Sequence, residues 1–113
     1  MLTEDNFDTF LEENDNVFVE FYVTWCSFSA GVAPTWEEFG NTVVQQGLDM
    51  RVAKVDCTAQ ADFCHKSSKT RVMAFPTMRW FKNGQRMSPD YRMGRTLESF
   101  LDYSKEQLDG RFS

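Results

Sequence analysis

The sequence predicts an α/β domain whose central, mixed β-sheet is flanked by helices on both faces. Helical and strand-like segments alternate up to residue 82, an order typical of a sheet that begins with parallel strands. The dipeptide Asn83-Gly84 then predicts a tight hairpin, which adds an antiparallel end to the sheet. The chain has 113 residues, no internal repeat and no linker-like stretch, so we expect residues 1–113 to form a single domain.

The first half of the chain is predicted to form a helix, a strand and a second helix. Thr3 is a suitable cap for a helix over residues 3–14. Residues 17–23 are β-branched, aromatic and almost all apolar, which indicates a central strand buried on both faces. Apolar residues spaced at three or four predict a helix over residues 27–46, which Pro34 should kink.

The second half is predicted to complete the sheet and add a last helix. The expected elements are strand 50–57, helix 58–68, strand 76–82, returning strand 85–92 and helix 96–108. Pro89 favours an edge position for the returning strand, because proline cannot donate a ladder hydrogen bond. Thr96 is the expected cap of the last helix.

Charge and hydropathy exclude several function classes. Twelve basic and seventeen acidic residues give a net charge of −5, and the basic residues are scattered along the sequence. We therefore expect neither nucleic acid nor a membrane as a partner. The first ten residues do not resemble a signal peptide and the last six carry no retention tetrapeptide. The protein is then either cytosolic or directed by a signal outside this sequence.

Cysteine usage points to the candidate chemistry. Of Cys26, Cys57 and Cys64, at least one must remain unpaired within the chain. Cys26 falls where a helix begins, and the N–H groups and dipole there favour a thiolate, the species that attacks disulfides. The alternative is an inert, buried cysteine.

Ser29 stands where a Cys-x-x-Cys pair would have its second sulfur, so release of a mixed disulfide needs an outside thiol. An engineered serine is a further alternative, although Phe28, a second departure from a dithiol site, argues against it.

Six motifs in order resemble a thioredoxin-fold domain of the protein disulfide isomerase family over essentially the whole chain. They are "VEFYVTWC", "AP" shortly after Trp-Cys, "AKVDCT", "FPT", "FKNGQ" and "GRTLESF". The resemblance implies a thioredoxin fold. The family normally opens with an additional strand, so we expect that N-terminal strand to be trimmed here to Met1 and Leu2.

The family site usually reads Trp-Cys-Gly-His-Cys, whereas residues 25–29 read Trp-Cys-Ser-Phe-Ser. Phe28 cannot stabilise a thiolate by charge as the family's histidine does, so Cys26 should be a weaker acid than in ordinary members. The Cys-x-Phe-Ser form is similar to a monothiol member that retains client proteins in the early secretory pathway. That similarity implies the endoplasmic reticulum lumen and mixed disulfides with clients or other oxidoreductases.

The same resemblance assigns supporting roles to five further residues. It implies a buried Glu20–Lys54 pair beneath the site, either a structural relic or a device that tunes Cys26. It implies a cis bond before Pro76, with the Phe75 backbone available to hydrogen-bond an extended client. Arg95 matches a family arginine that assists the site, although a solvated arginine is equally compatible with the sequence.

Cys57 and Cys64 are close enough in sequence for a local disulfide, worth about 2.5 kcal/mol on a chain-entropy estimate. Resemblance to a dithiol member with three such domains supports the pairing, which implies an oxidising compartment. The rivals are two reduced buried cysteines or a second redox site. We expect no metal, because His65 adjoins Cys64 and no fourth ligand follows, and His65 is expected to be solvated.

The first functional hypothesis is a domain that captures clients through Cys26 and needs no cofactor. The second is a monothiol isomerase or reductase turned over by glutathione. The third is a redox-inactive module that binds unfolded chains through Trp25, Phe28 and Phe75. Met73 and Met93 belong either to a client groove or to the core. The polar, basic segment 65–75 has no assigned role.

Overall fold

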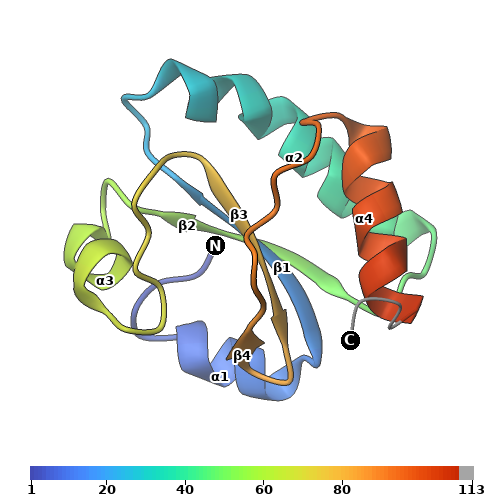
Figure 1. Ribbon diagram of the computed structural model, residues 1–113, viewed down its shortest axis with the longest axis horizontal. Helices are drawn as coiled ribbons and strands as arrows, with labels where there is room; N and C mark the ends of the chain where they lie inside the picture. Colours follow the sequence, from blue (N-terminus) through green and yellow to red (C-terminus); the bar gives the residue numbers. More distant parts are fainter. Residues whose placement is uncertain (110–113) are drawn as a thin grey trace.

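The computed structural model describes residues 1–109 and contains a four-stranded mixed sheet with helices on both faces (Figure 1). The elements are α1 (Phe7–Glu13), β1 (Asn16–Tyr22), α2 (Ser27–Gln45), β2 (Arg51–Asp56), α3 (Ala61–Lys66), β3 (Thr77–Lys82), β4 (Gln85–Arg86) and α4 (Leu97–Asp109). The strand order is β2-β1-β3-β4, with β1 and β2 parallel and the other two pairs antiparallel. The fold class predicted from the sequence is confirmed.

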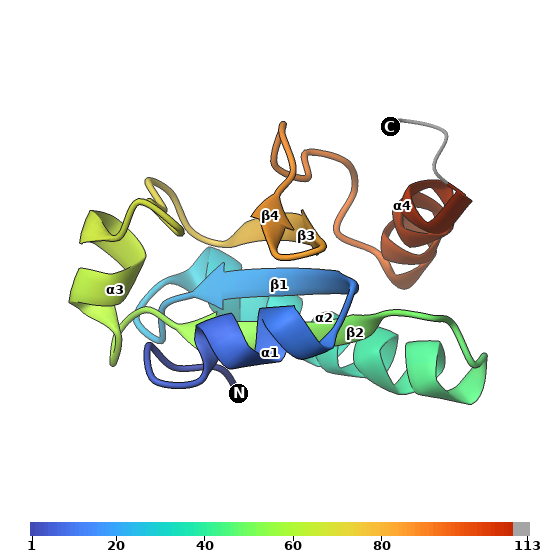
Figure 2. The same ribbon diagram turned by 90° about the horizontal axis from the view of Figure 1, so that it is seen from below.

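Strand β1 lies at the centre because both of its faces are apolar. Val17, Val19 and Phe21 pack into a core under α1 and α3. Phe18 points to the opposite face and enters a second core under α2 and α4. Figures 1 and 2 show these two helix pairs on opposite sides of the sheet. The buried, all-apolar run therefore holds both layers together.

The second core is built largely from aromatic rings. The ring of Phe18 lies 4.9 Å from Trp36 of α2 and 6.3 Å from Phe100 of α4, both in edge-on geometry. Trp36 also donates a 3.1 Å hydrogen bond from its indole nitrogen to the carbonyl of Ala53. These contacts fix α2 against β1 and β2, and α2 continues past Pro34. The beginning of α2 is thus held at one end of the sheet.

Several predicted boundaries are wrong. Residues 4–6 form a turn in place of the first helical turn, so the cap position falls on Asn6 and Thr3 does not cap α1. The returning strand keeps only Gln85–Arg86, because the regular ladder is interrupted around Pro89. The N–H groups of Met87 and Tyr91 still donate 2.9 Å hydrogen bonds to carbonyls of β3. α3 is likewise shorter at both ends than expected.

Other local predictions are confirmed. Asn83 and Gly84 have φ values of 52° and 81°, as a tight hairpin requires. The Thr96 hydroxyl accepts a 3.1 Å hydrogen bond from the Ser99 N–H and caps α4. Leu2 forms a parallel bridge with Val55, where the additional N-terminal strand was expected. Within residues 1–109, no helix is both long and apolar enough to cross a membrane.

Candidate functional site

Cys26 lies immediately before α2, at the end of the sheet where β1 stops. Its extended backbone and its carbonyl, which accepts a 3.0 Å hydrogen bond from Ala30, make it the N-cap residue of the helix. The thiol is partly exposed and takes no part in a disulfide. Trp25 and Phe28 flank it with 74% and 68% of their surface exposed. The site therefore contains one free, partly exposed cysteine with two exposed aromatic residues close to it in sequence.

Ser29 lies one turn into the helix and is buried. Its hydroxyl oxygen accepts a 3.3 Å hydrogen bond from the N–H of Val23, which ties the first turn of α2 to the end of β1. A hydrogen bond from the Ser29 N–H is the main cause that lowers the pKa of the Cys26 thiol. Partial burial raises this pKa by a smaller amount. The Phe28 N–H, the Ser29 hydroxyl and the positive charge of Arg95 lower it further. Donors at a helix start thus favour the Cys26 thiolate.

Glu20 is a buried carboxyl on β1 and only 2% exposed. Its Oε2 atom has no hydrogen-bond partner. Burial raises the pKa of Glu20 to about 7, while the charges of Lys54 and Arg95 act in the opposite direction. A large fraction of this carboxyl is therefore neutral near pH 7, which limits the cost of burying it.

Glu20 and Lys54 are neighbours, as the resemblance implied, but they do not form a salt bridge in the part of the chain that the structure describes. Glu20 pairs with Lys54 in the parallel register of β1 and β2. The Lys54 ammonium lies 5.9 Å from the ring centre of Tyr22. Lys54 is half-buried on the edge strand β2, where its ammonium avoids the desolvation that a buried pair requires.

The segment before β3 contains the cis bond that the resemblance implied. The Phe75–Pro76 bond is cis, and Pro76 is buried. The half-buried Phe75 ring meets the His65 ring edge-on at 5.8 Å. His65, otherwise exposed, also contacts the Val72 carbonyl through Nδ1 at 3.2 Å. The segment 65–75 therefore packs back on α3 and carries the backbone toward Pro76.

Cys57 and Cys64 form a disulfide with an S–S distance of 2.06 Å. Both residues are buried, and the bond joins the end of β2 to α3. Neither sulfur is thus placed to act as an exposed redox centre. Among residues 1–109, no group of three or more His, Cys, Asp and Glu side chains is arranged to hold a metal ion.

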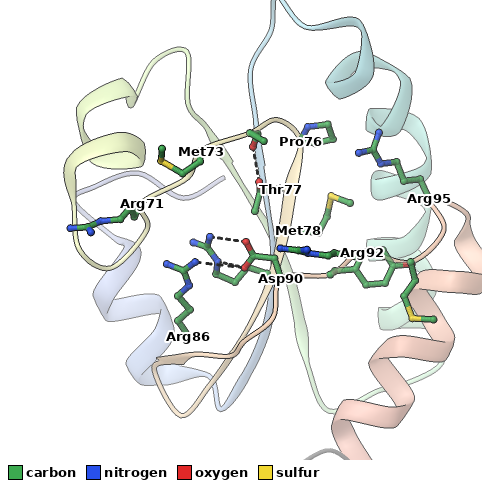
Figure 3. Close-up of a pocket in the computed structure, with 13 residues that line it drawn as sticks. Arg71, Met73, Pro76, Thr77, Met78, Arg86, Asp90, Arg92 and Arg95 are labelled. Carbon is green, nitrogen blue, oxygen red and sulfur yellow. Dashed lines mark hydrogen bonds and ion pairs between the residues drawn. The ribbon is translucent and has the colours of Figure 1, made fainter.

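The folded chain also forms a basic cavity that the sequence analysis missed. The basic residues were described as scattered, which is wrong for the folded chain, because five arginines line one cavity of about 570 Å³ (Figure 3). They are Arg71, Arg79, Arg86, Arg92 and Arg95. Met73 and Met93 line the same cavity and are 85% and 64% exposed, so the alternative of core packing is wrong for both. Arg79, inside the apolar run of β3, offered the one available sequence signal, and the sequence analysis did not use it.

Known proteins resemble this chain in both sequence and fold. The family profile described as Thioredoxin matches residues 1–106, nearly the whole chain. The chain belongs to the thioredoxin family. Among individual proteins, it is 38% identical over 107 residues to protein disulfide-isomerase 1 of Dictyostelium discoideum, covering 94% of this chain and 29% of that protein.

Two further relatives of this thioredoxin-family chain combine sequence and structural similarity. Endoplasmic reticulum resident protein 44 of Bos taurus is 31% identical over 109 residues, which cover 94% of this chain and 26% of the relative. The solved zinc-bound form of human ERp44 superposes with a TM-score of 0.85 at 30% identity, covering 94% of this chain and 30% of that one. The chain therefore spans less than a third of these relatives.

Proposed function

We propose that this domain captures client proteins in the endoplasmic reticulum lumen by forming a mixed disulfide at Cys26. The observation that carries the proposal is the accessible Cys26 thiol at the start of α2, whose pKa is lowered by the N–H of Ser29. Relatives named as disulfide isomerases and as an endoplasmic reticulum resident protein support the reaction class and the compartment.

The reaction is a thiol–disulfide exchange without net oxidation. The Cys26 thiolate attacks one sulfur of a client disulfide, a new S–S bond forms to Cys26, and the old bond breaks. The departing client sulfur leaves as a thiolate and takes a proton from water. Because Ser29 has no sulfur, the mixed disulfide ends only when an external thiol, from glutathione or from a client cysteine, attacks it.

The surroundings of Cys26 suit an extended polypeptide. Phe75 precedes a cis proline, and backbone groups at such a position can pair with an incoming strand. Trp25, Phe28 and Met73 add exposed apolar surface, which fits unfolded client segments. These contacts position the client disulfide, and Cys26 supplies the covalent bond.

Exposed aromatic surface also favours a second candidate, a module that holds clients without redox chemistry. Mass spectrometry of the protein mixed with a disulfide-bonded peptide separates the two. The proposal predicts a covalent adduct with the wild type and none with Cys26→Ser. Equal retention of the peptide by both proteins, without an adduct, would favour the redox-inactive module.

A further inference from the structure

The cavity of about 570 Å³ lies between two segments that are far apart in sequence. One wall comes from residues 71–79 and the other from residues 86–95. In Figure 3, Arg71 and Arg86 lie toward one side of the cavity, Arg95 lies toward the other, and Arg92 lies between them. Arginine occurs at only seven positions in the chain, and five of them contribute here.

Arg79 is already satisfied by the fold. Its guanidinium forms a two-point ion pair with the carboxylate of Asp90, at 2.6 Å and 3.0 Å. It also donates a hydrogen bond to the carbonyl of Thr70 and lies over the ring of Phe21. Asp90 is the only acidic residue among those that line the cavity. The negative charge of Asp90 is therefore already paired with the buried guanidinium of Arg79.

The other four arginines are exposed at the cavity rim. Arg86 comes within 4.0 Å of Asp90, and 37% of its side-chain surface remains exposed. Within residues 1–109, Arg71, Arg92 and Arg95 form no salt bridge with a carboxylate. On a chain with a net charge of −5, this is a local concentration of cations opposite in sign to the whole molecule. Such a concentration favours an anionic ligand.

Cys26 does not line the cavity, but Arg95 and Pro76 of its lining relate the cavity to the candidate site. Pro76, whose preceding bond is cis, forms part of its lining. Arg95, on the opposite wall, is close enough to lower the pKa of the Cys26 thiol by its charge. We therefore expect a polypeptide that is bonded to Cys26 to reach the space between the arginines by way of Arg95.

We propose that this cavity selects clients that carry Asp or Glu side chains close to the cysteine captured by Cys26. The inference rests on the proposed function, since it names the clients of that site. Arginine binds carboxylates through paired N–H donors, which gives geometric as well as electrostatic selectivity. Met73 and Met93 provide adaptable apolar contacts for the intervening residues, so the cavity accepts varied acidic sequences.

The first arm of the test measures binding without thiol chemistry. Three fluorescent peptides of equal length, with serine in place of cysteine, carry flanks rich in Glu, Gln or Lys. We expect the Glu peptide to bind about tenfold more tightly than the Gln peptide at low salt, and the difference to shrink in high salt. Combining Arg71→Gln with Arg92→Gln should remove that difference. Arg51→Gln, at an exposed arginine outside the cavity, should leave it unchanged.

The second arm repeats the comparison with disulfide-bonded peptides and follows adduct formation at Cys26. A faster reaction of the Glu peptide, lost in the double variant, would support the inference. Equal binding and equal rates for the Glu and Gln peptides would overturn it, even if adducts form and the proposed function survives. A Glu preference in the first arm without any adduct in the second would support the arginine-lined site for acidic peptides but contradict capture through Cys26.

Discussion

The hydroxyl oxygen of Ser29 accepts a 3.3 Å hydrogen bond from the N–H of Val23, the residue that follows β1. Ser29 is therefore buried, whereas Cys26, one helical turn earlier, keeps an accessible sulfur. The two positions of the Cys-x-x-Ser motif thus have different tasks. Ser29 secures the start of α2 and contributes donors that favour a thiolate, and Cys26 remains partly exposed.

The substitution Ser29→Ala should weaken both tasks. Loss of the buried hydrogen bond to the Val23 N–H should lower the free energy of unfolding by about 1 kcal/mol, because a buried donor loses its acceptor. Loss of the hydroxyl should also raise the pKa of Cys26. Denaturant unfolding and thiol titration measure the two effects. Ser68→Ala, at an exposed serine, is the matched control and should change neither quantity.

Arg95 should influence the acidity of Cys26 through its charge. Arg95→Gln is expected to raise the pKa of Cys26, since a nearby positive charge favours the thiolate. Absorbance of the thiolate against pH measures the shift, with Cys26→Ala as the blank. The alkylation rate of Cys26 should fall at pH 7 for the same reason. An unchanged titration curve would assign Arg95 a role in binding alone.

Glu20 should make the stability of the domain depend on pH. Its pKa is about 7 in the folded protein against an ordinary value of 4.5, so the folded state holds more protons between these pH values. The free energy of unfolding should therefore decrease as pH rises through this window, by about 3 kcal/mol in total. Below pH 4.5 and well above pH 7 the contribution of Glu20 is constant.

The variant Glu20→Gln isolates this effect, since the amide does not titrate. Compared with the wild type, it should show a flatter profile of unfolding free energy between pH 4.5 and pH 8. Urea unfolding at several pH values measures the difference. Parallel profiles for the two proteins would mean that Glu20 keeps an ordinary pKa.

The pair Arg79–Asp90 should be a major stabilising contact. The Arg79 side chain is 1% exposed, so Asp90→Asn leaves a buried cation without its counter-charge. We expect a loss of about 3 kcal/mol in the free energy of unfolding. Asp62→Asn, which breaks the exposed pair with Lys66, should cost less than about 0.5 kcal/mol. Similar losses for the two variants, measured by denaturant unfolding, would contradict this account.

Local sequence signals predicted the elements that depend on one segment alone. The apolar run of β1 and the Asn83-Gly84 hairpin were predicted correctly, because each depends on neighbouring residues only. The start of α1 was misplaced, since Thr3 satisfied the pattern of a cap while the chain formed turns up to Asn6.

Relationships between distant segments were harder to predict. The register of Glu20 and Lys54 followed from two strands, but the position of the lysine ammonium depends on solvation at the sheet edge. The basic cavity is formed by β3 and by loop segments that carry no periodic pattern, so linear spacing gave no sign of it. Arg79 was the exception, as an arginine inside an apolar strand needs a buried partner.

The most direct test of the central claim is the lifetime of the Cys26 mixed disulfide. The wild type and Ser29→Cys would each be mixed with a disulfide-bonded peptide, and the adduct followed by mass spectrometry with and without glutathione. Capture through Cys26 predicts a wild-type adduct that persists until glutathione is added, and a Ser29→Cys adduct that disappears without it. Absence of any wild-type adduct, while Ser29→Cys reacts, would contradict the claim.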